Sequence, residues 1–450
     1  MNPVETQLAG AALDGGPFAA EAAAVAALPQ PEALRRLRAS AYARFRELGY
    51  PSPREEEWRF TNVAPVARTN FERPAPAADP RRRALEVAPF RLEGTREIVF
   101  VDGRFAPELS SAEPPAGMRI ASFAALAAQG DLGAFAAVLG RKAGFVDQPF
   151  LALSTALFED GLGIEIASGA TVAEPLHVIF HSTAAASASA SFPRLVILAG
   201  ENSEATVVES HCGAPGAVYL ASAATEIVAA PAARLEHYEF QRESREAFHF
   251  ATLHVETGRA ATVATHSFSL GGAIARHDIR GVLAGEGGEA TFNGLYLVDG
   301  RQLVDTHMRI DHVAPRCASH ELYKGILEGK SRAVFNGRIH VHPGAQKTDA
   351  KQTNRNLLLS DDALVNTNPQ LEIFADDVKC THGSTVGQLD AEAVFYLRSR
   401  GIGAEAAKSL LTYAFASDLV NRVKVDSLQR ELQEFLFAWI PQGEVVRHAV

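Results

Sequence analysis

The spacing of apolar residues divides the chain into helical ends and a β-rich middle. From Pro31 to Leu48 apolar side chains recur every three or four residues, which predicts an amphipathic helix. The segment Ile98–Phe105 is apolar apart from a central Asp102-Gly103, which predicts a β-hairpin. We therefore expect residues 1–150 to form a mostly helical region that contains one short hairpin.

From about residue 160 short strands replace helices, and they repeat. Five segments share the order strand, Gly or Pro turn, small residue, strand: 195–208, 225–238, 253–264, 281–292 and 310–321. Their alignment places five residues in equivalent positions: Ala205, Arg234, Ala261, Ala290 and Ser319. The spacing of roughly 27 to 29 residues is typical of solenoids and propellers. Because no helical segment lies between the strands, the pattern favours a β-solenoid over residues 151–388. A sandwich with evenly spaced hairpins is the alternative.

The helical period returns after Asp390, so residues 389–450 are expected to form a C-terminal helical domain. Its apolar positions define a stripe that we call the C-terminal stripe: Leu411, Phe415, Leu419, Leu432, Phe435 and Trp439. Such a stripe either caps the open end of the solenoid or docks another chain. The pattern alone does not decide between these roles.

Composition narrows the function classes. A hydrophobic content of 47% with 21% charged residues is typical of a folded globular chain, and a net charge of -10 argues against a general nucleic-acid binder. Three cysteines are too few for a disulfide framework, which indicates a reducing compartment. No apolar run approaches the roughly 20 residues that span a bilayer, and no basic segment of a signal peptide opens the chain. We expect a cytoplasmic protein.

The most informative motif is the pair Cys380 and His382 in the last predicted strand. Alternate residues of a strand share a face, so both side chains point the same way. Thiol and imidazole are ligands that iron and zinc accept, but two ligands are half a site, which a partner would have to complete. The alternative is a buried cysteine beside a locally bonded histidine. His340 and His342 also share a strand face and either join a mixed site with this pair or belong to a polar face.

No motif indicates an autonomous enzyme. Gly325–Ser331 resembles a phosphate-binding loop, but only three residues separate its glycines and no helix follows. The chain also lacks a nucleophile elbow, a His-Glu-x-x-His motif and a Cys-x-x-Cys pair.

Several longer segments together resemble a known family. They are Arg54–Trp58, Ser331–His340, Gln346–Ala350, Gln352–Ser360, Lys379–Leu389 and Phe395–Gly401. These runs are similar to the SufB/SufD family, the scaffold components of the SUF iron–sulfur cluster assembly system. Within it the form of the Lys379–Leu389 segment and the small number of cysteines resemble the SufD branch more than the SufB branch.

The resemblance implies a right-handed parallel β-helix flanked by N-terminal and C-terminal helical domains. It implies a non-catalytic scaffold that pairs with SufB through the end of both β-helices and docks SufC, an ABC-type ATPase, through the C-terminal helices. His382, with Cys380, would hold transient iron or a nascent cluster at the SufB interface, and the isolated chain would bind no cofactor stably.

Two rival functions stay open. One is a SufB-like scaffold that acts alone as a homodimer. The other is a β-helix carbohydrate-active enzyme, which the low aromatic content of 8% and the absence of Trp from the predicted solenoid disfavour.

Overall fold

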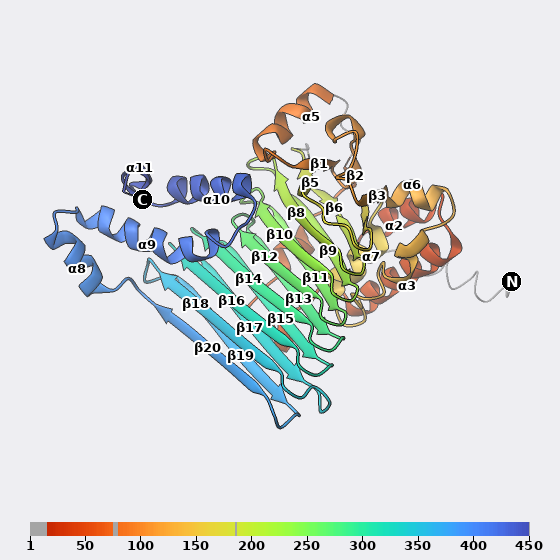
Figure 1. The fold of residues 1–450 in the computed structure, drawn as a ribbon. Helices are drawn as coiled ribbons and strands as arrows, with labels where there is room; N and C mark the ends of the chain where they lie inside the picture. Colours follow the sequence, from red (N-terminus) through yellow and green to blue (C-terminus); the bar gives the residue numbers. More distant parts are fainter. Residues whose placement is uncertain (1–15, 75–79, 185–186, 450) are drawn as a thin grey trace.

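The computed structural model describes residues 16–74, 80–184 and 187–449, and two long β-sheets dominate it (Figure 1). Sheet 1 contains, in order, β2 (Arg104–Phe105), β1 (Arg96–Val101), β5 (Leu176–Ser182), β8 (Glu204–Gly213), β10 (Arg234–Arg242), β12 (Thr262–Ser269), β14 (Glu289–Val298), β16 (Ala318–Leu327), β18 (Asp349–Leu358) and β20 (Lys379–Gly387). Sheet 2 contains β3 (Met118–Ser122), β4 (Leu162–Ile166), β7 (Arg194–Ala199), β9 (Tyr219–Ala229), β11 (Phe248–Thr257), β13 (Ile274–Leu283), β15 (Leu303–His312), β17 (Arg332–Val341) and β19 (Leu364–Ile373), with β6 (Ser189–Ser191) beside β9.

The chain winds as a parallel β-solenoid. From β7 to β20 successive strands alternate between the two sheets, and each pairs in parallel with the strand one coil earlier. The inner faces of both sheets bury a continuous apolar core along the axis. Each fully buried large side chain there stabilises the fold by about 1.5–3 kcal/mol. The predicted solenoid is confirmed, and the sandwich alternative is excluded because its neighbouring strands would be antiparallel.

The same turn recurs at the corner where the chain passes from sheet 2 to sheet 1. Two residues before each sheet 1 strand from β8 to β18 the backbone adopts a positive φ, at Asn202, Ala232, Ala260, Gly287, Arg316 and Lys347. The backbone N–H of each of these residues donates to a carbonyl of the next coil, as Ala232 does to Arg259 at 2.8 Å. Stacked turns therefore hold the coils in register even where the residue is not glycine.

The five segments aligned from the sequence are these corners, but their alignment is partly wrong. The true column of paired residues runs Ala205, Leu235, Val263, Ala290 and Ser319. Arg234 and Ala261 are therefore offset by one and two positions. The turns differ in length from coil to coil, so a constant period cannot keep the register.

Helices from the N-terminal part cover the outer faces of the solenoid: the helix over residues 80–87 packs on sheet 1 beside Val99 and Ile179, and the others pack on sheet 2. They are α2 (Ala19–Ala26), α3 (Glu32–Leu48), α4 (Ala64–Arg68), α5 (Pro80–Val87), α6 (Phe123–Ala128) and α7 (Pro149–Leu157). The predicted helix forms α3, whose Leu34 and Phe45 pack with Phe150 of α7 and Phe250 of β11 in one apolar cluster. The predicted hairpin forms too, as β1 and β2. Because β1 also pairs in parallel with β5, the hairpin extends sheet 1 as well.

The C-terminal helices are α8 (Ala391–Ser399), α9 (Ala404–Val420), α10 (Asp426–Trp439) and α11 (Gly443–Arg447). Helices α9 and α10 pack on the outer face of sheet 1, where Leu419 and Leu432 join a cluster with Tyr238 and Leu295. They cover the side of the solenoid and leave its last strands, β19 and β20, uncovered (Figure 1). The C-terminal helices therefore do not cap the end of the solenoid, which was one of the two roles expected for them.

Over the ranges that the structure describes, no helix has the length and apolar character needed to cross a bilayer.

Candidate metal-binding end of the solenoid

Cys380 and His382 lie on β20, the last strand of sheet 1. Their partners on β18 are Ala350 and Gln352, which are both buried inside the solenoid. Paired residues of neighbouring parallel strands point to the same face, so both side chains face the interior of a coil that nothing covers. The predicted shared face of the two residues is thus present at the open end of the molecule.

The two side chains have different surroundings. Cys380 is partly buried and packs against an apolar cluster that includes Ile339, Val341 and Ala350. Burial raises the pKa of the Cys380 thiol, and the nearby Asp349 carboxylate adds to the shift. His382 is exposed and forms no hydrogen bond or ion pair with any residue that the structure describes. At neutral pH the imidazole is the readier ligand of the pair, since thiols bind metals as thiolates.

Below His382 the interior is polar. In the column of paired residues His382 follows Gln352, and Gln352 follows Glu321 one coil deeper. Gln352 Nε2 donates to Glu321 Oε2 at 3.3 Å, whereas Glu321 Oε1 and Gln352 Oε1 are buried without a hydrogen-bond partner. Burial raises the pKa of Glu321 to about 8, against the opposing effect of hydrogen bonds from Ser319 and Gln352. A neutral carboxyl group therefore lies about 10 Å, two strand spacings, beneath the imidazole.

The final coil exposes apolar side chains as well as unpaired strand edges. We call the surface of β19 and β20 the open end; its exposed large apolar residues are Leu364, Ile373, Phe374 and Val386. Ser384 of β20 donates to Thr367 of β19 at 3.0 Å, which links the two sheets across this coil. An uncovered apolar strand edge is a surface that proteins normally protect or pair with another chain.

The C-terminal stripe is divided by the fold. Leu419 and Leu432 are buried between their helices and sheet 1, whereas Phe415, Phe435 and Trp439 are half-buried around the same cluster. Leu411 is half-buried as well but is not part of that cluster. The most exposed apolar residues of the C-terminal region lie instead on α8, where Phe395 is 71% and Tyr396 is 56% exposed. None of the residues of α8 is buried. The helical period predicted an amphipathic face, but it did not reveal which half packs within the chain.

His340 and His342 gather with Asp311, not with Cys380 and His382. His340 Nδ1 lies 2.8 Å and His342 Nε2 3.5 Å from Asp311 Oδ1, on the outer side of sheet 2. The mixed site considered for the four residues is not formed, because one pair faces the interior and the other faces outward.

Sequence reasoning missed Glu321 and Gln352. Their signal was polar residues at alternate positions of strands otherwise expected to be buried, such as Ser319, Glu321 and Tyr323. Glu321 and Gln352 lie beneath His382 only because the strands of successive coils pair in this register.

Comparisons with known proteins agree with this architecture. The family model "SUF system FeS cluster assembly, SufBD core domain" matches residues 180–415, and the model of the SufBD N-terminal region matches residues 18–178. The iron–sulfur cluster assembly protein SufD of Escherichia coli is 34% identical over 402 residues, which are 88% of this chain and 90% of that protein. An iron–sulfur cluster assembly SufBD family protein of Synechocystis is 33% identical over 405 residues, 86% of this chain and 87% of the relative.

The two family models and these relatives identify the class as a protein of the iron–sulfur cluster assembly family. The chain belongs to the SufB/SufD family, and within that family it is most like SufD.

Proposed function

We propose that the chain is a non-enzymatic scaffold subunit that pairs with SufB through the open end and docks the SufC ATPase through its C-terminal helices. The observation that carries the proposal is the uncovered last coil, which presents His382 and Cys380 among exposed apolar residues and free strand edges. A second solenoid that pairs with these edges satisfies their backbone groups and covers the apolar surface.

Iron and sulfur are the cargo of this site. His382 supplies an imidazole, a ligand that binds iron without adding negative charge, and SufB thiolates supply the remaining ligands. Cys380 keeps its proton more firmly than an exposed cysteine because burial raises its pKa. His382 is therefore the principal ligand from this chain, and Cys380 is a secondary one.

Helix α9 couples the ATPase to the solenoid in this proposal. Lys324 of β16 lies 2.7 Å from Asp418 of α9, and its Nζ donates to the Phe415 carbonyl at 3.0 Å. Lys324 is almost fully buried, so this contact is stiff and a displacement of α9 reaches sheet 1 directly. Movement of SufC upon ATP binding would in this way open the end of the solenoid to cargo.

The test is co-expression of the tagged chain with the SufB-like and SufC-like proteins of its organism, followed by anaerobic purification. We expect His382→Ala to leave the complex intact and to lower its bound iron and sulfide several-fold, with a smaller loss in Cys380→Ala. His320→Ala is the matched control, since it removes an exposed histidine from the outer face of the same sheet.

Wild-type cluster content in the His382→Ala complex would overturn the proposed role of this residue. A wild-type chain that ignores both partners and assembles a cluster as a pair of identical copies would favour the homodimeric scaffold instead.

A further inference from the structure

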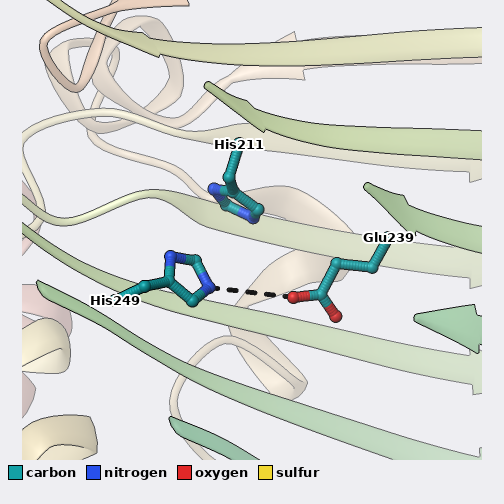
Figure 2. Close-up of side chains that lie close together, drawn as sticks. All are labelled: His211, Glu239 and His249. Atoms are coloured by element: carbon teal, nitrogen blue, oxygen red, sulfur yellow. Dashed lines mark ion pairs between the residues drawn. The ribbon is translucent and has the colours of Figure 1, made fainter. Parts of the chain in front are cut away.

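The solenoid interior holds a second group of metal-ligand side chains, far along the stack from the open end. His211 of β8, Glu239 of β10 and His249 of β11 converge there from both sheets (Figure 2). One ligand atom of each residue lies within 4.8 Å of the ligand atoms of the other two, and all three residues are buried. We call this group the interior triad.

The arrangement around His249 is that of a metal-binding histidine. Its Nδ1 lies 2.8 Å from Glu243 Oε2, on one side of the ring, and its Nε2 lies 3.8 Å from Glu239 Oε1, on the side of the triad. The residue is only 3% exposed, and neither nitrogen has the alignment of a regular hydrogen bond to these carboxylates. Metal-binding histidines characteristically direct one nitrogen to the metal and the other to a carboxylate, which fixes the ring.

His211 and Glu239 have similar support. His211 Nε2 lies 3.0 Å from Glu209 Oε1, and Glu239 Oε2 lies 2.9 Å from His277 Nε2. Glu209 and His277 therefore orient the triad, as the residues that contact metal ligands do in known metal sites.

The charge of this region also favours a cation. The ion pairs described for its three buried glutamates, Glu209, Glu239 and Glu243, all involve histidines. Buried carboxylates need compensating positive charge, and a divalent ion supplies more of it than one imidazolium.

We propose that His211, Glu239 and His249 bind a divalent ion that prefers mixed nitrogen and oxygen ligands, of the class of Zn²⁺ or Fe²⁺. Two imidazoles and one carboxylate are a ligand set that both ions accept, and a water completes the coordination. Since the triad is buried, the ion enters as the chain folds and acts as a structural clamp between the two sheets.

The second histidine cluster in the described part of the chain is a weaker candidate. The Asp311 carboxylate near His340 and His342 already receives a bidentate ion pair from Arg309, at 2.9 and 3.1 Å. The guanidinium occupies the oxygens that a metal would need.

The experiment uses the full-length chain expressed in medium supplemented with Zn²⁺, and separately with Fe²⁺ under anaerobic conditions. We expect close to one equivalent of metal per chain by elemental mass spectrometry, retained during dialysis against a chelator and released when denaturant is added. The two media distinguish the ions that share this chemistry.

The variants identify the ligands. His249→Ala and Glu239→Gln should each lower bound metal at least tenfold. The Gln variant keeps the volume of the side chain, so it tests the site even if His249→Ala does not fold. His342→Ala and His382→Ala are controls that should retain the metal, and the second separates this site from the proposed function at the open end.

Less than a tenth of an equivalent in the wild-type chain from both media would overturn the proposal. Full metal content in a folded Glu239→Gln chain would overturn it as well.

Discussion

At the scale of single residues, Glu321 has the clearest measurable consequence. Its side chain is 2% exposed beneath the open end, and burial raises its pKa from 4.5 to about 8. Between these two values the folded chain keeps a proton that the unfolded chain releases. The free energy of unfolding must therefore fall as pH rises through this window and level off above it.

Replacement of Glu321 by Gln should remove this pH dependence. The amide keeps the volume of the side chain but does not ionise, so the variant should gain stability relative to wild type as pH rises from 5 to 8. The slope is at most about 1.4 kcal/mol per pH unit, which amounts to a few kcal/mol at pH 8. Urea unfolding midpoints at several pH values measure it. Glu246→Gln, at an exposed turn, is the control and should follow wild type. If the stability of wild type and of Glu321→Gln changed with pH in parallel, the raised pKa of Glu321 would be refuted.

At the scale of elements, neighbouring strands fit by pairing large residues with glycine. Gly294 of β14 pairs with Tyr323 of β16, and Tyr296 pairs with Gly325 in the same two strands. A Cβ added to Gly325 would lie 2.0 Å from the Tyr296 ring and 2.6 Å from Asn356 Oδ1. These glycines are required by close packing in the interior, because none of the neighbouring atoms belongs to an exposed side chain that can move away.

Gly325→Ala should therefore destabilise the chain by about 1–3 kcal/mol, the usual cost of an overpacked core. Gly387→Ala is the matched control, since Gly387 ends β20 and a Cβ there meets no atom within 4 Å. Thermal unfolding midpoints should fall for the first variant and stay unchanged for the second. Equal midpoints for the two variants would show that the interior relaxes around the added methyl group.

How much the sequence could predict depended on whether a feature was local. The strand–turn–strand repeat predicted the solenoid, and the period of two in β20 placed Cys380 and His382 on one face. The coil register was missed at Arg234 and Ala261, because turn lengths vary between coils. The interior triad and the stack that contains Glu321 each form from separate strands, so no short motif could predict either of them.

At the scale of the whole molecule, two separate surfaces are not covered by any of the residues that the structure describes. One is the open end, where Ile373 and Val386 are exposed at the last strands, and the other is α8 with Phe395 and Tyr396. Helix α8 follows β20 in the chain, yet its aromatic residues do not pack on the solenoid. The two surfaces should therefore bind different partners independently.

Paired substitutions should separate these interfaces. Ile373→Lys with Val386→Lys places charges on the open end, so it should weaken binding of the SufB-like partner at least tenfold and spare the SufC-like partner. Phe395→Asp with Tyr396→Asp should do the reverse, because it removes the exposed aromatic anchors of α8. Native mass spectrometry of the co-expressed proteins measures which complexes persist. Val218→Lys, which alters an exposed residue just before β9, is the control and should keep both. If either double variant loses both partners while its fold is intact, the surfaces act as one interface, and SufC would reach the open end directly instead of through α9.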